Sequence, residues 1–190
     1  MSSILKVDQL QDSGGNNLVT SNGSGVITSS AFGKVLQVVS TTKTDTFSTT
    51  AGGDAPATIT GLTATITPSS TSSKILVMPN VSIGTAGNNH IGFTLFRDTT
   101  AIGIGDASGV RPRNSFVGSV YVDSTATWNM QSASFNFLDS PNTTSATTYS
   151  LKVGGNGSTT IYINRAGRDS NNTNEDGRYA STITLMEISA

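Results

Sequence analysis

Five aspartates are the first candidates for chemistry, because a glycosidase uses two carboxyl groups, one as an acid and one as a base or nucleophile. They are Asp98, Asp106, Asp123, Asp139 and Asp169. No spacing in the sequence pairs any two of them, and each stands beside a turn-forming residue. Aspartate at a turn commonly accepts hydrogen bonds from its own backbone. We therefore predict five turn-capping aspartates and no glycosidase site.

His90 is the only histidine, and the chain has no cysteine. It follows Gly87-Asn88-Asn89 and precedes Ile91, which predicts the end of a loop at the start of a strand. No Gly-x-Ser-x-Gly nucleophile motif accompanies it. A transition-metal site would consist almost wholly of carboxylates. The sequence predicts no catalytic residue, no metal ligand and no cofactor, so the protein is not expected to be an enzyme.

The oxygen-rich stretch 169–177 leaves two interpretations open. It could hold a calcium ion, although it lacks the glycine at position six and the distal glutamate of an EF-hand loop. It is also typical of a mobile polar loop between two strands, which is the interpretation that we favour. The glycines in 102–109 have the wrong spacing for a phosphate-binding loop, and no helix pattern follows them.

Arginines are better suited than carboxylates to a surface role. Paired guanidinium groups can bind the carboxylates or sulfates of an acidic polysaccharide. The candidate ligand contacts are Arg111, Arg113, Arg165 and Arg168. Solvation of a loop and pairing between subunits are the competing interpretations. Trp128 and the four tyrosines fall inside predicted strands, which favours core or cross-strand positions over exposed platforms for sugars.

The composition argues against several classes of binding partner. The 190 residues carry a net charge of -1, and only 12% of them are charged, against about 25% in an average domain. A near-neutral chain without a lysine or arginine run is not expected to bind nucleic acid or an anionic membrane by electrostatics. The first residues show no signal-peptide pattern, and no apolar run approaches the ~20 residues of a membrane helix.

Residues 1–33 differ in their sequence pattern from the rest of the chain. Two glycine-rich clusters interrupt a few regularly placed apolar residues, and such a segment cannot bury enough apolar area alone to offset its ordering entropy. We interpret it as an extended attachment segment that is ordered against a partner. Its expected contact residues are Ile4, Leu5, Val7, Leu10, Leu18 and Val19.

Residues 34–190 read as one all-β domain, because strand patterns alternate with turn residues and no helix pattern occurs. We predict an antiparallel β-sandwich, jelly-roll-like, with the run 74–83 at its centre. Gly61 leaves 59–66 open as one bent strand or two short ones. Pro79 predicts a bulge or an exit to a sheet edge. The expected strands are 35–39, 59–66, 74–83, 91–95, 115–122, 127–138, 147–153, 159–164 and 179–188.

Several runs resemble the short tail-fibre-like virion proteins of cyanobacterial and other marine phages. At the N-terminus these are ILKVD (4–8) and QDSGGN (11–16); in the body they are GKVLQVV (33–39), ITPSS (66–70), SFNFLDSP (134–141) and STITLMEI (181–188). The resemblance implies a homotrimeric β-sandwich on a virion, made in the host cytoplasm, with the N-terminal segment docked on the particle. It carries over no functional residues.

Three functions follow from these observations. The favoured hypothesis is a non-enzymatic tail-fibre-like appendage that contacts the host surface, with sister copies, other virion proteins and a host glycan as partners. Because anchor and domain are nearly adjacent, with no shaft between them, a capsid decoration (cement) protein is the alternative. A carbohydrate-binding module is the third.

Overall fold

The computed structural model describes residues 7–21, 23–24, 27–28, 34–120, 127–171 and 174–189. Every named element within these residues is a β-strand, and none of them contains a helix long and apolar enough to span a bilayer. The strands are β1 (Gln9–Gln11), β2 (Asn17–Ser21), β3 (Ile27–Thr28), β4 (Val35–Lys43), β5 (Phe47–Thr49), β6 (Ala57–Ile66), β7 (Lys74–Thr85), β8 (Asn89–Arg97), β9 (Thr100–Ile102), β10 (Phe116–Val120), β11 (Met130–Ser134), β12 (Phe137–Asp139), β13 (Thr147–Gly154), β14 (Ile161–Ile163) and β15 (Ser181–Ile188).

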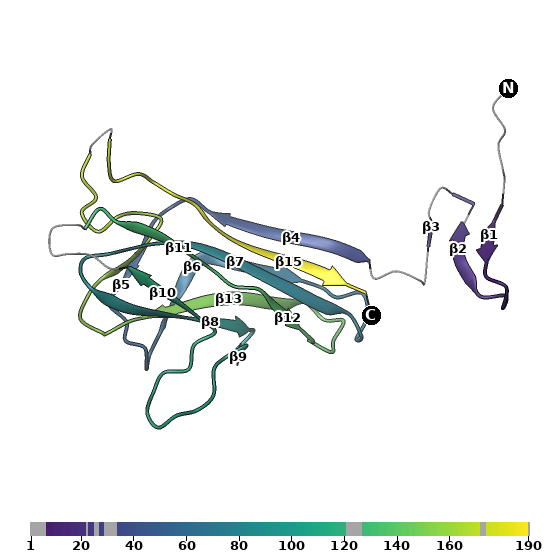
Figure 1. The fold of residues 1–190 in the computed structure, drawn as a ribbon, viewed down its shortest axis with the longest axis horizontal. Helices are drawn as coiled ribbons and strands as arrows, with labels where there is room; N and C mark the ends of the chain where they lie inside the picture. Colours follow the sequence, from purple (N-terminus) through teal and green to yellow (C-terminus); the bar gives the residue numbers. More distant parts are fainter. Residues whose placement is uncertain are drawn as a thin grey trace.

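Two antiparallel sheets pack face to face, so the predicted all-β sandwich is confirmed (Figure 1). The smaller sheet has the order β10-β8-β13-β6, with β9 also paired to β8. In the larger sheet β4, β15, β7, β14 and β5 follow one another, and β11 and β12 also pair with β7. All twelve strand pairings are antiparallel.

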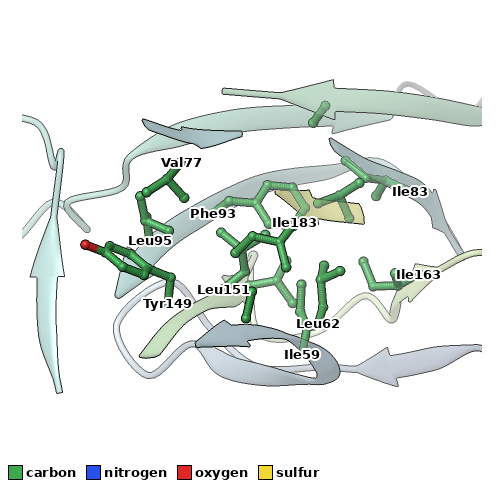
Figure 2. Packing of buried hydrophobic residues seen from close by; sticks show 14 of the residues in the cluster. Ile59, Leu62, Val77, Ile83, Phe93, Leu95, Tyr149, Leu151, Ile163 and Ile183 are labelled. Carbon is green, nitrogen blue, oxygen red and sulfur yellow. The ribbon is translucent and has the colours of Figure 1, made fainter. Parts of the chain in front are cut away.

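The core lies between the sheets and is built mainly from alternate residues of the strands; Figure 2 shows its central part. In β7 the residues Ile75, Val77, Val81 and Ile83 point inward and are fully buried. Burying a side chain of this size contributes roughly 1.5–3 kcal/mol relative to leaving it exposed. The central position predicted for 74–83 is confirmed, because β7 has partner strands on both sides.

A row of stacked phenylalanines closes one side of the sandwich. Phe93 and Phe116 of the smaller sheet stack at 4.8 Å between ring centroids. Phe116 then stacks on Phe135 at 5.4 Å, and Phe135 on Phe137 at 6.2 Å. The row thus runs from the smaller sheet across to the chain that borders β7 in the larger one. Such offset aromatic pairs add to the stability that burial alone supplies.

The expectation for Pro79 was wrong. β7 continues through Pro79 in an unbroken register with β15, and the strand neither bulges nor leaves for an edge. The irregularity lies in the neighbouring segment of the same chain. Its strand is interrupted between β11 and β12, and both parts keep the same register with β7. Phe135 lies in that gap and donates its N–H to the Pro79 carbonyl oxygen at 3.3 Å. Because Pro79 has no N–H to return, the ladder is broken opposite it.

Other strand predictions hold with adjusted bounds. β6 is a single strand, and Gly61 (φ +79°) bends it where only glycine adopts the conformation without strain. The expected strand 127–138 is divided into β11 and β12. β8 was expected to be half-buried, yet Gly92 and Thr94 are covered as well, because Asn114 lies over them. Short β5 and β9 were not predicted.

The N-terminal strands form a sheet of their own in the order β1-β2-β3. Figure 1 draws it outside the two packed sheets, beside the end of the sandwich where β4 begins and β15 ends. Val7 and Leu10 are more than half exposed, and Leu18 and Val19 are half-buried. Leu10 lies opposite Val19 in the β1–β2 register. Ile4, Leu5, Tyr121 and Asp123 lie outside the described residues.

Candidate functional site

The candidate site is the loop between β14 and β15, whose described part covers residues 164–171 and 174–180. Both strands pair with β7, with Ile163 opposite Ile83 and Thr182 opposite Asn80. The chain therefore leaves the sheet after β14 and returns to nearly the same place in β15. In Figure 1 this loop lies at the end of the sandwich away from the N-terminal sheet.

Asn164 begins the loop and fixes it to the sheet. It is fully buried at φ +66° and donates from Nδ2 to the Lys43 and Asp45 carbonyl oxygens at 2.8 and 2.9 Å. Its Oδ1 accepts from Ser181 Oγ at 2.6 Å. Asparagine tolerates this left-handed conformation better than most residues. One side chain therefore ties the departure of the loop to its return at Ser181.

Small residues bring the loop down onto β7. A Cβ on Gly84 would lie 2.4 Å from the Arg165 carbonyl oxygen, and one on Gly167 would lie 2.3 Å from the Thr85 carbonyl oxygen. Ala166, between these contacts, is fully buried. The two glycines thus allow a close backbone approach that any larger residue would prevent. This close approach fixes the distance between β7 and the charged residues that follow in the loop.

Asp169 sits between two arginines. Arg165 Nη1 lies 2.7 Å from its Oδ2, and Arg178 pairs with its Oδ1. The hydrogen bond from Arg178 is the main cause that lowers the pKa of Asp169 below its usual value. The Arg165 guanidinium also lies over the Tyr162 ring at 3.9 Å. Arg165 is thereby held on both sides, by a carboxylate and by an aromatic face.

A second ion-pair group forms around Asp176. Its Oδ2 accepts from Arg168 Nε at 2.8 Å and from the Ser170 backbone N–H at 3.0 Å, and Ser170 Oγ bonds the same oxygen. Arg168 also pairs with Glu175. The hydrogen bond from Arg168 lowers the pKa of Asp176, and the pKa of Arg168 is raised in turn. Every charge of this group therefore has a partner within the loop.

The other carboxylate oxygen of Asp176 is different. The Asp176 side chain is fully buried, yet its Oδ1 has no hydrogen-bond partner, and it is the only buried side-chain nitrogen or oxygen among the described residues of which this is true. Another part of the loop lines a pocket of about 300 Å³, whose residues are Asp169, Ser170, Asn171, Asp176 and Arg178. A buried acceptor without a donor is unfavourable by roughly 1–3 kcal/mol.

Two aromatic residues flank this loop, contrary to the expectation that they lie within strands. Trp128 precedes β11 and is 41% exposed, and Tyr179 precedes β15 and is 46% exposed. The Arg168 guanidinium lies over the Trp128 ring, 5.1 Å from its centre. Tyr179 borders a second, smaller hollow of about 200 Å³ with Ser82, Met130 and Gln131. No signal in the sequence marked these two rings as exposed.

The four candidate arginines do not gather in one place. Arg165 and Arg168 belong to the loop described above. Arg111 and Arg113 lie in the loop between β9 and β10, where Arg111 Nη1 donates to Ser108 Oγ at 2.9 Å and Arg113 Nε to the Gly105 carbonyl oxygen at 2.6 Å. Loop solvation or pairing between subunits was the use expected in preference to ligand binding, and within the chain Arg165 and Arg168 form ion pairs.

The aspartates have two different roles. Asp98 sits in a turn (φ +51°), as predicted, but its Oδ1 accepts from the Thr148 backbone N–H in β13 at 2.9 Å and not from its own turn. Asp139 was wrongly assigned to a turn: it is buried at the end of β12. There it accepts from Arg97 Nη1 at 2.9 Å and from the Tyr149 hydroxyl at 2.7 Å. Burial first, and then this hydrogen bond, raise the pKa of Tyr149. The group joins the two sheets.

His90 is exposed near the start of β8, where the sequence suggested it. Within the described residues, no group of three or more histidine, cysteine, aspartate or glutamate side chains could hold a metal ion. In the 169–177 stretch, Asp169, Glu175 and Asp176 each pair with an arginine. Guanidinium groups therefore occupy the place of the cation in the calcium interpretation.

Comparison with known proteins finds partial similarities of shape. No family model matches the chain, and no curated protein sequence matches it. Among solved structures, it is similar to the D431N mutant VP2 protein of infectious bursal disease virus, from T=1 particles, with 15% identity over 86% of this chain and a TM-score of 0.39. It is also similar to a VP2 subviral particle of the same virus, with 13% identity over 87% of this chain and a TM-score of 0.39. This chain covers 39% and 44% of those two chains.

Proposed function

We propose that this protein is a non-enzymatic structural protein of a phage virion, a homotrimeric tail-fibre-like appendage. Residues 1–33 dock on the particle, and residues 34–190 project outward to contact the host surface. The proposal starts from the resemblance of the runs at 4–16 and 33–39 to such proteins. The observation that carries it in the structure is the unusual outer face of the larger sheet.

That outer face has a row of apolar side chains across four neighbouring chain segments. Val38 lies opposite Met186, Met186 opposite Leu76, and Leu76 opposite Leu138. Val35 and Ile188 form the next pair along. Val38 and Leu138 are more than half exposed. An apolar row of this kind on a sheet face is typical of a surface that a partner covers.

Charge is nearly missing from the same face. On β4, β7, β11, β12 and β15, the outward positions alternate with the buried ones, and Lys74 is the only charged residue among them. Lys74 itself donates to Ser140 Oγ at 2.7 Å. An exposed protein surface usually has about 25–35% charged residues. Covering this face would desolvate almost no charge, so contact with a second copy is inexpensive.

The arrangement of the ends also supports an appendage. Among the residues that the structure describes, the strands of the N-terminal sheet pair only with one another, and Val7 and Leu10 are exposed, where a binding partner would cover them. The loop with Asp169 and Asp176 lies at the other end of the sandwich (Figure 1). A chain fixed by its first residues would therefore carry this loop away from the particle.

The test is a deletion of residues 1–33. The truncated protein should fold with the melting temperature of the sandwich but no longer bind particles from which the full chain has been removed. Full-length protein with Asp54→Asn serves as the binding control. Particle binding that survives the deletion would overturn the attachment role of this segment.

Copy number separates the appendage from capsid decoration, the second candidate, which the charge-poor sheet face would also suit. Quantitative mass spectrometry of purified particles should give a number compatible with a few trimers at one vertex or on the tail. Hundreds of copies spread over the head would favour decoration. Absence of the chain from particles would favour the third candidate, a free carbohydrate-binding module.

A further inference from the structure

The large apolar side chains that are exposed among the described residues fall into three groups. Val7 and Leu10 belong to the N-terminal sheet. The second group lies on the larger sheet and beside the β14–β15 loop, and consists of Val35, Leu36, Val38, Leu138, Trp128 and Tyr179. The third group is Val110, in the loop between β9 and β10, and Val117 in β10. The first group is assigned to the particle and the second to contact between copies, so the third group has no assigned partner.

The symmetry of a trimer requires two different surfaces on each copy. A contact that uses the same patch on both partners relates them by a two-fold axis, and such a contact cannot close a ring of three. In a three-fold ring, one patch of each copy meets another patch of the next copy. The outer face of the larger sheet therefore needs a complementary surface elsewhere on the same chain. The third apolar group is available for this purpose.

Val110 stands at the tip of a projecting turn and its side chain is fully exposed. The turn is closed by the Arg111 backbone N–H, which donates to the Ser108 carbonyl oxygen at 3.2 Å, and Gly109 supplies the left-handed conformation (φ +59°) that the turn needs. In Figure 1 the loop between β9 and β10 extends beyond the strands on the side of β8 and β9, away from β4. The valine is thus presented outward and is not folded against its own chain.

The base of this loop is held firmly against the smaller sheet. The Gly105 backbone N–H donates to the Asn114 carbonyl oxygen at 3.1 Å. The Asn114 side chain lies directly over Gly92, where a Cβ would come within 2.2 Å of it. Pro112 packs on Gly53, where a Cβ would lie 2.8 Å from the proline ring. Because the loop is already ordered, it loses little conformational freedom when a partner covers its tip.

A hollow on the outer face of the larger sheet could receive such a tip. Its volume is about 200 Å³, and it is lined by Ser82, Met130, Gln131, Ser132 and Tyr179, none of which is charged. Ser82 and Ser132 lie opposite each other in the β7–β11 register. Methionine and tyrosine are enriched where proteins contact one another. An apolar side chain that enters this hollow would cover the thioether and the ring without burying a charge.

We propose that in the trimer Val110 of each copy enters the hollow lined by Met130 and Tyr179 on the next copy. The β9–β10 loop and the outer face of the larger sheet then form one contact, which is repeated three times around the ring. Val117 lies in the strand that the loop enters and adds apolar surface on that side. This inference rests on the homotrimer of the proposed function and names the two surfaces that meet in it.

Crosslinking tests the contact directly, because the chain has no cysteine and an introduced pair reports only its own proximity. Val110→Cys is combined with Gln131→Cys in the full-length protein, which is treated with a short bismaleimide crosslinker. A denaturing gel should show covalent dimers and trimers. Two controls should run as single chains: Val110→Cys alone, and Val110→Cys combined with Thr63→Cys, which is exposed on the smaller sheet.

Val110→Asp tests whether the contact contributes to assembly. Because the side chain is fully exposed, the substitution should leave the circular dichroism spectrum of the fold unchanged. It should weaken association by at least about tenfold in analytical ultracentrifugation, since a carboxylate would have to enter an uncharged hollow. Thr63→Asp introduces the same charge outside the contact and should associate like the parent.

The outcomes separate this contact from the proposed function. A trimeric parent whose paired cysteines do not crosslink, or a Val110→Asp protein that associates like the parent, would overturn the contact and leave the homotrimer standing. A monomeric parent would overturn both. A protein that forms this contact but is absent from purified particles would contradict the virion role alone.

Discussion

Asp139 shows how a single buried carboxylate joins the two layers of the sandwich. It comes from β12 in the larger sheet, whereas Arg97 and Tyr149 come from β8 and β13 in the smaller one. Inside the protein a hydrogen-bonded charge pair of this kind is not itself strong evidence for stability, but breaking it leaves a buried charge without compensation. The group therefore acts as a cross-sheet connection that is sensitive to the loss of any one member.

Tyr149→Phe removes the phenolic donor and retains the ring. We expect the free energy of unfolding to fall by about 1.5–3 kcal/mol, because the lost hydrogen bond goes to a charged acceptor. Asp139→Asn should be more severe, at about 3 kcal/mol or more, since Arg97 loses its counter-ion. Urea unfolding measures both. Tyr162→Phe, on the outer face, is the control and should change stability by less than about 0.5 kcal/mol.

Glu187 is another buried acid, located on β15 beneath the loop that follows β6. Burial alone would raise its pKa, but hydrogen bonds from Ser69, Gln37 and Ser73 outweigh this and lower the pKa to about 2. Ser69 donates from both its backbone N–H (2.7 Å) and its hydroxyl (2.6 Å). The folded protein therefore holds Glu187 ionised at pH values where the unfolded chain protonates it.

This difference predicts an acid-sensitive stability. The folded pKa lies below the unfolded value near 4.5, so the contribution of Glu187 is complete above pH 4.5 and is lost as the pH falls toward 2. Glu187→Gln should unfold at lower urea concentration at pH 7, and its stability should fall less steeply between pH 4.5 and pH 2. Asp54→Asn, at an exposed position, should follow the parent curve. Parallel curves for Glu187→Gln and the parent would contradict the assignment.

At the scale of elements, the contact between Gly84 of β7 and the loop after β14 controls the candidate site. The Arg165 carbonyl oxygen and the Met130 sulfur both occupy the space that a side chain at this position would need. Both partners are held by other contacts, since Arg165 is paired with Asp169 and Met130 lies in β11. The strand therefore cannot accept a larger residue without moving the loop.

Gly84→Ala should lower the free energy of unfolding by about 1–3 kcal/mol, the usual effect of inserting a methyl group into a tightly packed position. It should also displace Arg165 and so weaken its ion pair with Asp169. Thermal unfolding measures the loss of stability. Gly105→Ala is the matched control, because the nearest atom to its Cβ is the Asn114 carbonyl oxygen at 4.0 Å. Equal behaviour of the two variants would show that the loop is not held through Gly84.

Strand patterns could be predicted because they depend on local alternation. The inward residues of 74–83 and 147–153 follow the simple two-residue period, and both segments became strands with nearly the expected bounds. Pro79 was misjudged because its effect depends on which neighbour its missing N–H would face. That neighbour, Phe135, lies far along the chain, so no local pattern reveals it. β5 was missed because it is only three residues long and is a strand through its pairing with β14, which lies far along the chain.

The candidate site was predictable only in part. Arg165 and Arg168 stood out by their charge in a charge-poor chain, and both belong to the site. Asp176 did not, because its contacts with Arg168 and Ser170 form only when the loop folds back on itself. Trp128 and Tyr179 precede strands by two residues, a distance within the usual error of strand boundaries. Their exposure follows from that small shift.

At the scale of the whole molecule, the outer face of the larger sheet is the surface most suited to contact between copies. Its apolar row runs through Val38, Met186 and Leu76 to Leu138. Beyond the row the face carries hydroxyl side chains such as Ser40, which bonds Thr184 at 2.9 Å, and Lys74 is the one charged residue among the outward positions of the described strands. Such a face can be covered without leaving an unpaired charge.

A lysine in the apolar row should therefore prevent assembly. The parent is expected to sediment as a trimer, and Val38→Lys or Leu138→Lys should shift it to the monomer, because each buries a charge at the contact. Thr63→Lys, exposed on the smaller sheet, should remain trimeric. Analytical ultracentrifugation distinguishes these states. A monomeric parent, or a trimeric Leu138→Lys protein, would remove this face from the proposal.

The return of the chain to β7 after the loop has a consequence for variation. Since β14 and β15 each keep their own register with β7, residues can be added or removed between Asn164 and Ser181 without shifting any strand. Doubling the length of such a connection costs only about 0.6 kcal/mol in closure entropy. The segment could therefore be exchanged for one of different length and sequence while the sandwich stayed intact. Differences in sequence and length among relatives are expected to concentrate in this segment. It is also the place where binding preference could be changed by engineering.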